Sequence, residues 1–592
     1  MADPKLSRRG FLSTAAALAA SAAVPAGAEP PPQPPAPVPG SFGVGAVAPA
    51  GITEQTVAEA EKLAGVSYRA EQRTQLVASL GDQLAWPVKR RTVALPFSLA
   101  PATRFDPLLP GQKPPAGRSR LVRPKGPVPP LPAGDEALAF APVSDLSRWL
   151  QARQVTSVRL TRLALDRLKA AQPRLLCTIT LLEPQALREA EAADRELAAG
   201  RWRGPLHGIP YGAKDLLDTA GVATTFGAEP FRDRVPERDA VVIARLRAAG
   251  AVLVAKLTLG ALAMNDVWFG GQTRNPWLLA EGSSGSSAGP AAAVAAGLVP
   301  FAIGSETLGS IVSPAIRCGV AGLRPTFGRV PRTGAMPLSW TLDKLGPMAR
   351  GVEDTALVLA ALDGADPGDP GSVSMPLDLD LSRGVKGLRV GYDPAWLADK
   401  DAVPEDRAGL ELLRRAGATL VEVKLPDLPY EGLLPIIIAE SAAAFEELTL
   451  SHRDDELAMQ VADAWPNTWR AARFITAVDM VQADRLRRRV MVDLAALFST
   501  VDALAGPALA GPMLLVTNYT GHPCLTVRTG FRDISALRSD FARPAPTPLP
   551  APARVPHGIS LWTRPYDEGT LLRLGLALER AAGVANERPP AS

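Results

Sequence analysis

The residues best suited to chemistry are serines in two glycine-rich segments and a lysine ahead of them. Residues 282–297 hold four serines, and residues 304–311 include Ser310. A serine hydroxyl is almost wholly protonated at neutral pH, so it becomes a nucleophile only with a base within hydrogen-bond reach. Lysine is such a base when desolvation lowers its pKa, and Lys214 lies in the apolar-flanked segment 208–215. Together these residue types could attack a carbonyl carbon.

A flexible loop is the simpler interpretation of a stretch rich in serine and glycine. The residues that follow argue against it, because 290–297 predict a helix of small side chains that can pack closely against other backbone. A loop joined to so tightly packed a helix is itself buried. We therefore expect the serines to lie inside the domain.

A second catalytic arrangement also fits this stretch. Residues 285–289 match the Gly-x-Ser-x-Gly pattern of a nucleophile elbow, which would make Ser287 the nucleophile and a downstream histidine the base. Such an elbow needs a strand leading into it, and residues 278–282 offer only a short apolar piece. The elbow is the less favoured of the two hypotheses.

Three motifs carry a resemblance to a known family. They are Gly-Ile-Pro-Tyr-Gly-Ala-Lys-Asp at 208–215, the serine loop at 282–289, and Gly-Ser-Glu-Thr-Leu-Gly-Ser-Ile at 304–311. Their order and spacing resemble the amidase signature family, and the likeness extends over about residues 140–580. It implies an α/β fold whose core is a large mixed β-sheet covered on both faces by helices.

The resemblance also implies roles for three side chains. By its register, Lys214 is the general base and Ser310 is the nucleophile. Ser286 corresponds to the family's relay serine, which follows a cis peptide bond and passes the proton between the other two. The backbone amides of Thr307, Leu308 and Gly309 would form the oxyanion hole.

Several residues near Ser310 depart from the family pattern. Glu306 stands in place of Asp, Leu308 in place of Gly, and Val312 in place of the common Arg. A positive φ at Leu308 would be strained, since it has a side chain. We expect Arg317 to take over as the partner of Glu306.

The implied reaction is hydrolysis of a linear, small-molecule carboxamide to a carboxylate and ammonia or an amine, with no metal or organic cofactor. Two alternatives stay open. One is the glutamine-handling A subunit of a cytoplasmic tRNA-dependent amidotransferase, and the other is a binding protein that has lost catalysis. Trp268, Phe269 and Trp340 are candidates for lining a substrate pocket, although aromatic residues beside such loops often belong to the core.

Composition limits the other function classes. The chain has 592 residues, 47% of them hydrophobic, and 64 basic against 60 acidic residues. It contains no block of like charges of the kind that binds nucleic acid, so no nucleic-acid partner is indicated.

The first 28 residues resemble a twin-arginine export signal. Arg8 and Arg9 precede an apolar run over residues 12–24, and small residues at 26–28 form a cleavage site. This pattern predicts recognition by the twin-arginine machinery and a periplasmic or secreted protein with no stable membrane span. We expect a proline-rich linker and N-terminal extension over 29–135 and a catalytic domain over 136–592.

Periodicity and end signals place the main elements. Helices are expected at 53–63, 184–200, 240–249 and 568–582, and strands at 251–255 and 558–562. Residues 363–376 and 543–556 are expected to be loops, the first separating the catalytic stretch from the C-terminal half.

Overall fold

The computed structural model describes residues 47–96, 98–124, 126–540, 542–543 and 545–590. They fall into two compact units that divide between Ala94 and Leu95. The predicted export signal and the proline run that follows it lie outside the described residues.

The described part of the first unit is helical. It contains α1 (Glu54–Ala64), α2 (Ala70–Val77) and α3 (Gly81–Arg90). The predicted first helix is confirmed: the Thr53 side chain caps its start, and Gly65, with a φ of 65°, ends it.

The second unit is organised around an eleven-stranded mixed sheet. Parallel pairs lie toward both ends of the sheet, whereas the middle strands are antiparallel. From one edge to the other the strands are β14 (Thr419–Glu422), β13 (Arg389–Tyr392), β15 (Ala503–Pro507), β17 (Thr547–Trp562), β16 (Cys524–Leu537), β10 (Ala321–Arg324), β11 (Lys344–Ala349), β9 (Phe301–Glu306), β3 (Pro210–Lys214), β4 (Val252–Leu257) and β2 (Thr178–Leu181).

Helices cover both faces of this sheet, as predicted. Along β4, Val252 and Val254 pack into one apolar cluster and Leu253 into another, because successive side chains of a strand point to opposite faces. The first cluster includes residues of α6 (Ser157–Leu175), α7 (Glu183–Ala198), α9 (Ala288–Ala295) and α10 (Val312–Cys318). The second includes residues of α8 (Val241–Ala248) and α11 (Val352–Leu362).

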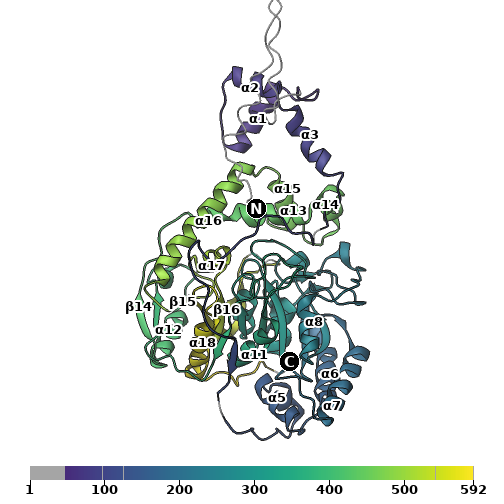
Figure 1. Cartoon of the computed structure of the whole chain (residues 1–592), viewed down its shortest axis with the longest axis vertical. Coiled ribbons are helices and arrows are strands. Elements are labelled where there is room, and N and C mark those ends of the chain that lie inside the picture. Colours follow the sequence, from purple (N-terminus) through teal and green to yellow (C-terminus); the bar gives the residue numbers. More distant parts are fainter. Residues whose placement is uncertain (1–46, 97, 125, 541, 544, 591–592) are drawn as a thin grey trace, which may run out of the picture. The chain divides into compact units, whose positions relative to one another are not determined.

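The two edges of the sheet carry different helices. In Figure 1, α6 and α7 lie side by side near the β2 edge, and α12 (Pro404–Arg415) lies beside β14 at the opposite edge. The remaining α-helices are α4 (Asp135–Ala139), α5 (Val143–Gln151), α13 (Leu434–Ala444), α14 (Glu446–Leu450), α15 (Trp465–Ala472), α16 (Ala477–Phe498), α17 (Met513–Tyr519) and α18 (Glu568–Ala582).

One predicted loop is wrong. Residues 547–556 belong to β17, which pairs with β16 from Leu537 back to Cys524. The prolines of this half of β17 all stand on one set of alternate positions, 548, 550, 552 and 556. Alternate residues of an antiparallel strand turn their N–H groups away from the partner, so proline is tolerated where no second strand lies alongside.

Residues 95–135 of the predicted N-terminal extension belong to the second unit and contribute a short strand to it. β1 (Arg120–Val122) pairs in parallel with β12 (Asp378–Asp380), and Arg120 forms a bidentate ion pair with Asp378. Among the residues that the structure describes, no helix is long and apolar enough to cross a membrane.

Candidate active site

Lys214 is the last residue of β3, in the interior of the sheet. Its side chain is fully buried, and its Nζ lies 2.7 Å from the Oγ of Ser286, 2.9 Å from that of Ser305 and 3.1 Å from that of Ser287. The same nitrogen lies 3.4 Å from the carbonyl oxygen of Ser305. The sequence-predicted lysine and the serine loop are therefore in direct contact.

Burial decides the charge of this amine. It lowers the pKa of Lys214 well below its ordinary value, although the carboxylates of Asp343 and Glu306 act in the opposite direction. The surrounding hydroxyls can hydrogen-bond a neutral amine as well as an ammonium ion, but they supply no negative charge. The structure thus favours the unprotonated form, which is the form able to accept a proton.

The serine loop fits closely against a neighbouring segment. The peptide bond between Gly285 and Ser286 is cis, as the resemblance implies. A Cβ at Gly285 would lie 1.8 Å from the carbonyl oxygen of Asn265, so no other residue fits without moving the backbone. The side chain of Asp266 accepts a hydrogen bond from the N–H of Ser284 at 2.9 Å, which fixes the entry to the loop.

Ser310 lies beside this loop. The N–H of Ser287 donates to the carbonyl of Ser310 at 3.0 Å, which places the two serine segments next to each other. Ser310 is 8% exposed, in contrast to the fully buried Lys214. The three sequence-predicted catalytic residues are thus brought together, with Ser310 on the solvent side.

Glu306, the last residue of β9, ties the start of the Ser310 loop to the residues that follow Ser310. One oxygen of its carboxylate accepts hydrogen bonds from the N–H groups of Ile311 and Val312 at 2.8 and 2.9 Å. The other accepts from Arg324 at 2.6 Å and from Asn518 at 2.8 Å. Burial alone would raise the pKa of Glu306, but Arg324, Lys344 and the N–H of Val312 outweigh it and lower the pKa to about 2.

The prediction that Arg317 pairs with Glu306 is wrong. Arg324 takes that place because β10, which ends at Arg324, lies two strands from β9 in the sheet, and β9 ends at Glu306. Arg317 lies in the last turn of α10, where its side chain is 11% exposed and pairs with Glu281 at 3.6 Å.

The Leu308 substitution introduces no backbone strain. The left-handed residue of this loop is Gly309, with a φ of 89°, and Leu308 is not among the described residues with positive φ. The N–H groups of Thr307, Leu308 and Gly309 donate to no acceptor among the residues that the structure describes. These amides remain available to bind a negatively charged oxygen.

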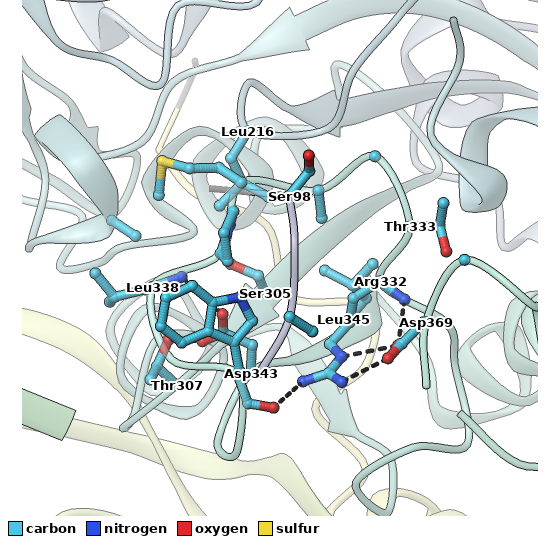
Figure 2. Close-up of a pocket in the computed structure, with 18 of the residues that line it drawn as sticks. Ser98, Leu216, Ser305, Thr307, Arg332, Thr333, Leu338, Asp343, Leu345 and Asp369 are labelled. Carbon is cyan, nitrogen blue, oxygen red and sulfur yellow. Dashed lines mark hydrogen bonds and ion pairs between the residues drawn. The ribbon is translucent and has the colours of Figure 1, made fainter. Parts of the chain in front are cut away.

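A cavity of about 100 Å³ opens beside Ser305 and Thr307. Trp340 lines it, whereas Trp268 and Phe269 are not part of this lining and pack against each other edge to face. Figure 2 shows Ser305 and Thr307 on one side of the cavity and the Arg332–Asp369 ion pair on the other. Its walls are largely apolar, with Leu216, Met336, Leu338 and Leu345 among them.

Sequence reasoning missed several residues of this site. Ser305 lies within a quoted motif, yet only the fold shows that it contacts Lys214. Asp343 orients Thr307 by accepting its hydroxyl at 2.6 Å, and no motif points to it. Asp369 comes from the loop expected only to separate two halves of the chain, but it lies at the cavity.

The nucleophile-elbow arrangement lacks its base. A strand, β8 (Leu278–Gly282), does lead into the loop, but it pairs only with β7 (Arg274–Asn275) in a small separate sheet. The buried histidines have partners elsewhere: His207 contacts Arg203 and Ala193, His522 contacts Thr520, and His557 contacts Asp406.

Comparison with known proteins agrees with the fold and identifies the family. A family model described as Amidase matches residues 159–572. The A subunit of glutamyl-tRNA(Gln) amidotransferase from Anaeromyxobacter dehalogenans is 34% identical over 466 residues, which are 73% of this chain and 94% of the relative. The structure of the peptide amidase from Stenotrophomonas maltophilia is 32% identical with a TM-score of 0.63, covering 76% of this chain and 98% of that one. A structure of a vestigial protein complex related to the origins of an s-triazine catabolic enzyme is 29% identical with a TM-score of 0.65, covering 74% and 98%.

The buried Glu306–Arg324 pair yields a stability prediction. Replacing Arg324→Met should lower the free energy of unfolding by about 3–5 kcal/mol, because it leaves a buried carboxylate without its cation. Chemical denaturation measures the change. The matched control is Arg414→Met, which breaks the exposed pair with Glu411 and should leave stability nearly unchanged. Equal midpoints for the two variants would contradict the assigned role.

Proposed function

Because this chain belongs to the Amidase family of amide-hydrolysing enzymes, we propose that it hydrolyses a carboxamide through an acyl-enzyme on Ser310. In this proposal Ser286 relays protons and Lys214 is the general base. The observation that carries it is the buried Lys214 amine, 2.7 Å from the hydroxyl of Ser286.

Counting protons around Lys214 favours Ser286 over Ser287 as the relay. The hydroxyl of Ser287 donates to the carbonyl of Ser305 at 3.0 Å, so it must accept a hydrogen bond from Lys214. A second N–H of Lys214 is taken up by Ser305. A neutral amine then has its lone pair left for the hydroxyl proton of Ser286.

The proton path follows from this arrangement. Neutral Lys214 accepts the proton of Ser286 while Ser286 accepts that of Ser310, whose Oγ bonds to the amide carbon. The carbonyl oxygen becomes an oxyanion, which the N–H groups of Thr307, Leu308 and Gly309 stabilise. The C–N bond then breaks as Ser286 returns the proton to the leaving nitrogen. Water repeats the sequence on the ester and releases the carboxylate.

The cavity supports an uncharged substrate group. Its walls are mainly apolar, and two of the charged side chains that line it, Arg332 and Asp369, neutralise each other through two hydrogen bonds of 2.7 and 2.9 Å. The third, Asp343, is taken up by hydrogen bonds from the Thr307 hydroxyl and from the N–H groups of Leu338 and Ser339. An added charge would find no free partner there. We therefore propose a neutral amide, with Trp340 among the residues that contact it.

A second candidate is a glutamine-handling component of an amidotransferase. It is supported by the 34% identity to the A subunit of glutamyl-tRNA(Gln) amidotransferase, which is matched over 94% of its length. Hydrolysis of free glutamine by the purified protein, increasing with added partner subunits, would favour this candidate over the amidase. The third possibility, a binding protein without catalysis, is opposed by the contact between Lys214 and Ser286 and by the retention of Ser310 in the adjacent segment.

We also propose export by the twin-arginine route to the periplasm or the medium. The support is the sequence alone, in which Arg8 and Arg9 precede an apolar run and a small-residue cleavage site.

The catalytic assignment predicts covalent labelling by a fluorophosphonate, because the Oγ of an activated serine displaces fluoride from phosphorus. The adduct should map to Ser310 by peptide mass analysis and disappear in Ser310→Ala and Lys214→Met. Lys169→Met, which removes an exposed lysine paired with Glu183, is the control and should label normally. An adduct at Ser287 would support the elbow, and unimpaired turnover by Ser310→Ala would refute the assignment.

The neutral base predicts a pH dependence. Since Lys214 acts unprotonated, turnover and labelling should rise with pH through its pKa and then level off. Burial lowers that pKa despite the nearby carboxylates of Asp343 and Glu306. The rate should therefore rise at a pH below about 10.4, the pKa of an ordinary lysine. A rate that is constant from mildly acidic to alkaline pH would rule out a lysine base.

The export proposal predicts a change of compartment. Replacing Arg8→Lys and Arg9→Lys together should retain the protein in the cytoplasm, because the receptor recognises the arginine pair and charge alone does not suffice. Cell fractionation and the mass of the N-terminal peptide report the outcome. Lys5→Arg serves as the control, and unchanged export of the double variant would count against this route.

A further inference from the structure

Two residues of the N-terminal extension line the cavity beside Ser305 and Thr307. Ser98 and Ala100 line the cavity together with Ser305, Thr307 and Trp340. Figure 2 shows Ser98 beside Leu216 among the residues that line the cavity. We call residues 98–105 the strap.

The end of the strap is fixed to both walls of the cavity. Arg104 donates to the carbonyl of Pro370, one of the residues that line the cavity, at 3.4 Å. The guanidinium of Arg487 lies 3.5 Å from the centre of the Phe105 ring and donates to the carbonyl of Thr341, next to Trp340, at 2.8 Å. One short segment therefore contacts the wall at 368–370 and, through Arg487, the wall at 340–341.

Further contacts keep the following residues in place. Phe105 packs edge to face on Phe327 with ring centres 5.2 Å apart, and Pro107 is buried. Beyond it, β1 pairs with β12, and the indole N–H of Trp149 donates to the carbonyl of Pro129 at 2.7 Å. The extension is thus packed along the catalytic unit on the C-terminal side of the strap.

The strap lies outside the part of the chain shared with relatives. The family model begins at residue 159, and the matched relatives are covered over 94–98% of their own length by 73–76% of this chain. The wall of the cavity that Ser98 and Ala100 form is therefore an addition to the family's catalytic domain. It narrows a space of about 100 Å³, compared with roughly 300–1,000 Å³ for typical small-molecule sites.

We propose that the strap determines substrate size by closing the cavity beside Thr307, so that only amides with a short, neutral acyl chain reach Ser310. This inference rests on the proposed amide hydrolysis. Leu99, which is 58% exposed between two lining residues, contributes no side chain to the lining. The selecting residues are therefore Ser98 and Ala100, and Arg104 and Phe105 position them.

The test compares two alkyl fluorophosphonates, one with an ethyl and one with a decyl chain on phosphorus, reacted with the full-length protein. The rate of adduct formation at Ser310 is measured by mass spectrometry. Wild-type protein should react at least about tenfold faster with the ethyl probe, because the decyl chain cannot enter the closed cavity. Phe105→Ala removes the ring that contacts Arg487 and Phe327 and so releases the end of the strap. The decyl probe should then react at least about tenfold faster than with wild type, and the ethyl probe within about threefold of wild type.

A second variant does not depend on releasing the anchor. Ala100→Trp adds bulk at the cavity and should lower the ethyl rate at least about tenfold. Ala102→Trp, at an exposed strap position outside the lining, is the matched control and should leave both rates unchanged. Thermal melting verifies that each variant is folded.

The outcomes separate the two proposals. If Ser310 labels but the ratio of ethyl to decyl rates is the same in wild type, Phe105→Ala and Ala100→Trp, the strap does not select substrates and the amidase proposal stands. If neither probe labels Ser310 in any variant, the proposed function fails and this inference fails with it.

Discussion

The chemistry of this molecule depends on removing one amine from water. A lysine in solution is protonated at neutral pH and cannot act as a base, and the sheet changes this by burying Lys214 at the end of an interior strand. The amine is surrounded by three serine hydroxyls and one carbonyl, which satisfy its hydrogen bonds without stabilising its charge. Moving Lys214 toward solvent would restore the charge and abolish the base.

The same interior also contains charged side chains, which are paired with one another and not with Lys214. Lys256, on the neighbouring strand, pairs with Asp215 at 2.9 Å, and Arg324 pairs with Glu306 at 2.6 Å. Each of these carboxylates has its own cation, and although Glu306, like Asp343, still raises the pKa of Lys214, burial outweighs both and lowers it. The acid next to the base and the acid next to the nucleophile are both neutralised by arginine or lysine from nearby strands.

The sequence was sufficient to predict the fold class and to select three segments that the structure places side by side, because their motifs are local and their order along the chain is characteristic. It failed for the partner of Glu306, because Arg324 and Arg317 are both close in sequence and only the strand order distinguishes them. It failed for the proline-rich half of β17, where composition suggests a loop and the alternation of the prolines permits a strand. Asp343 and Asp369 had no signal, since they reach the cavity through long-range packing alone.

The strap has a consequence for the order in which the chain folds. The strap and the strand that follows it bind residues far along the chain: Arg104 is 266 residues from Pro370, and Arg120 is 258 residues from Asp378. Loops of this length cost more entropy to close than the local helices of the same unit, and their contacts form only after their distant partners exist. The extension is therefore synthesised early but docks late, and the cavity remains open in the nascent catalytic domain until the strap has closed over it.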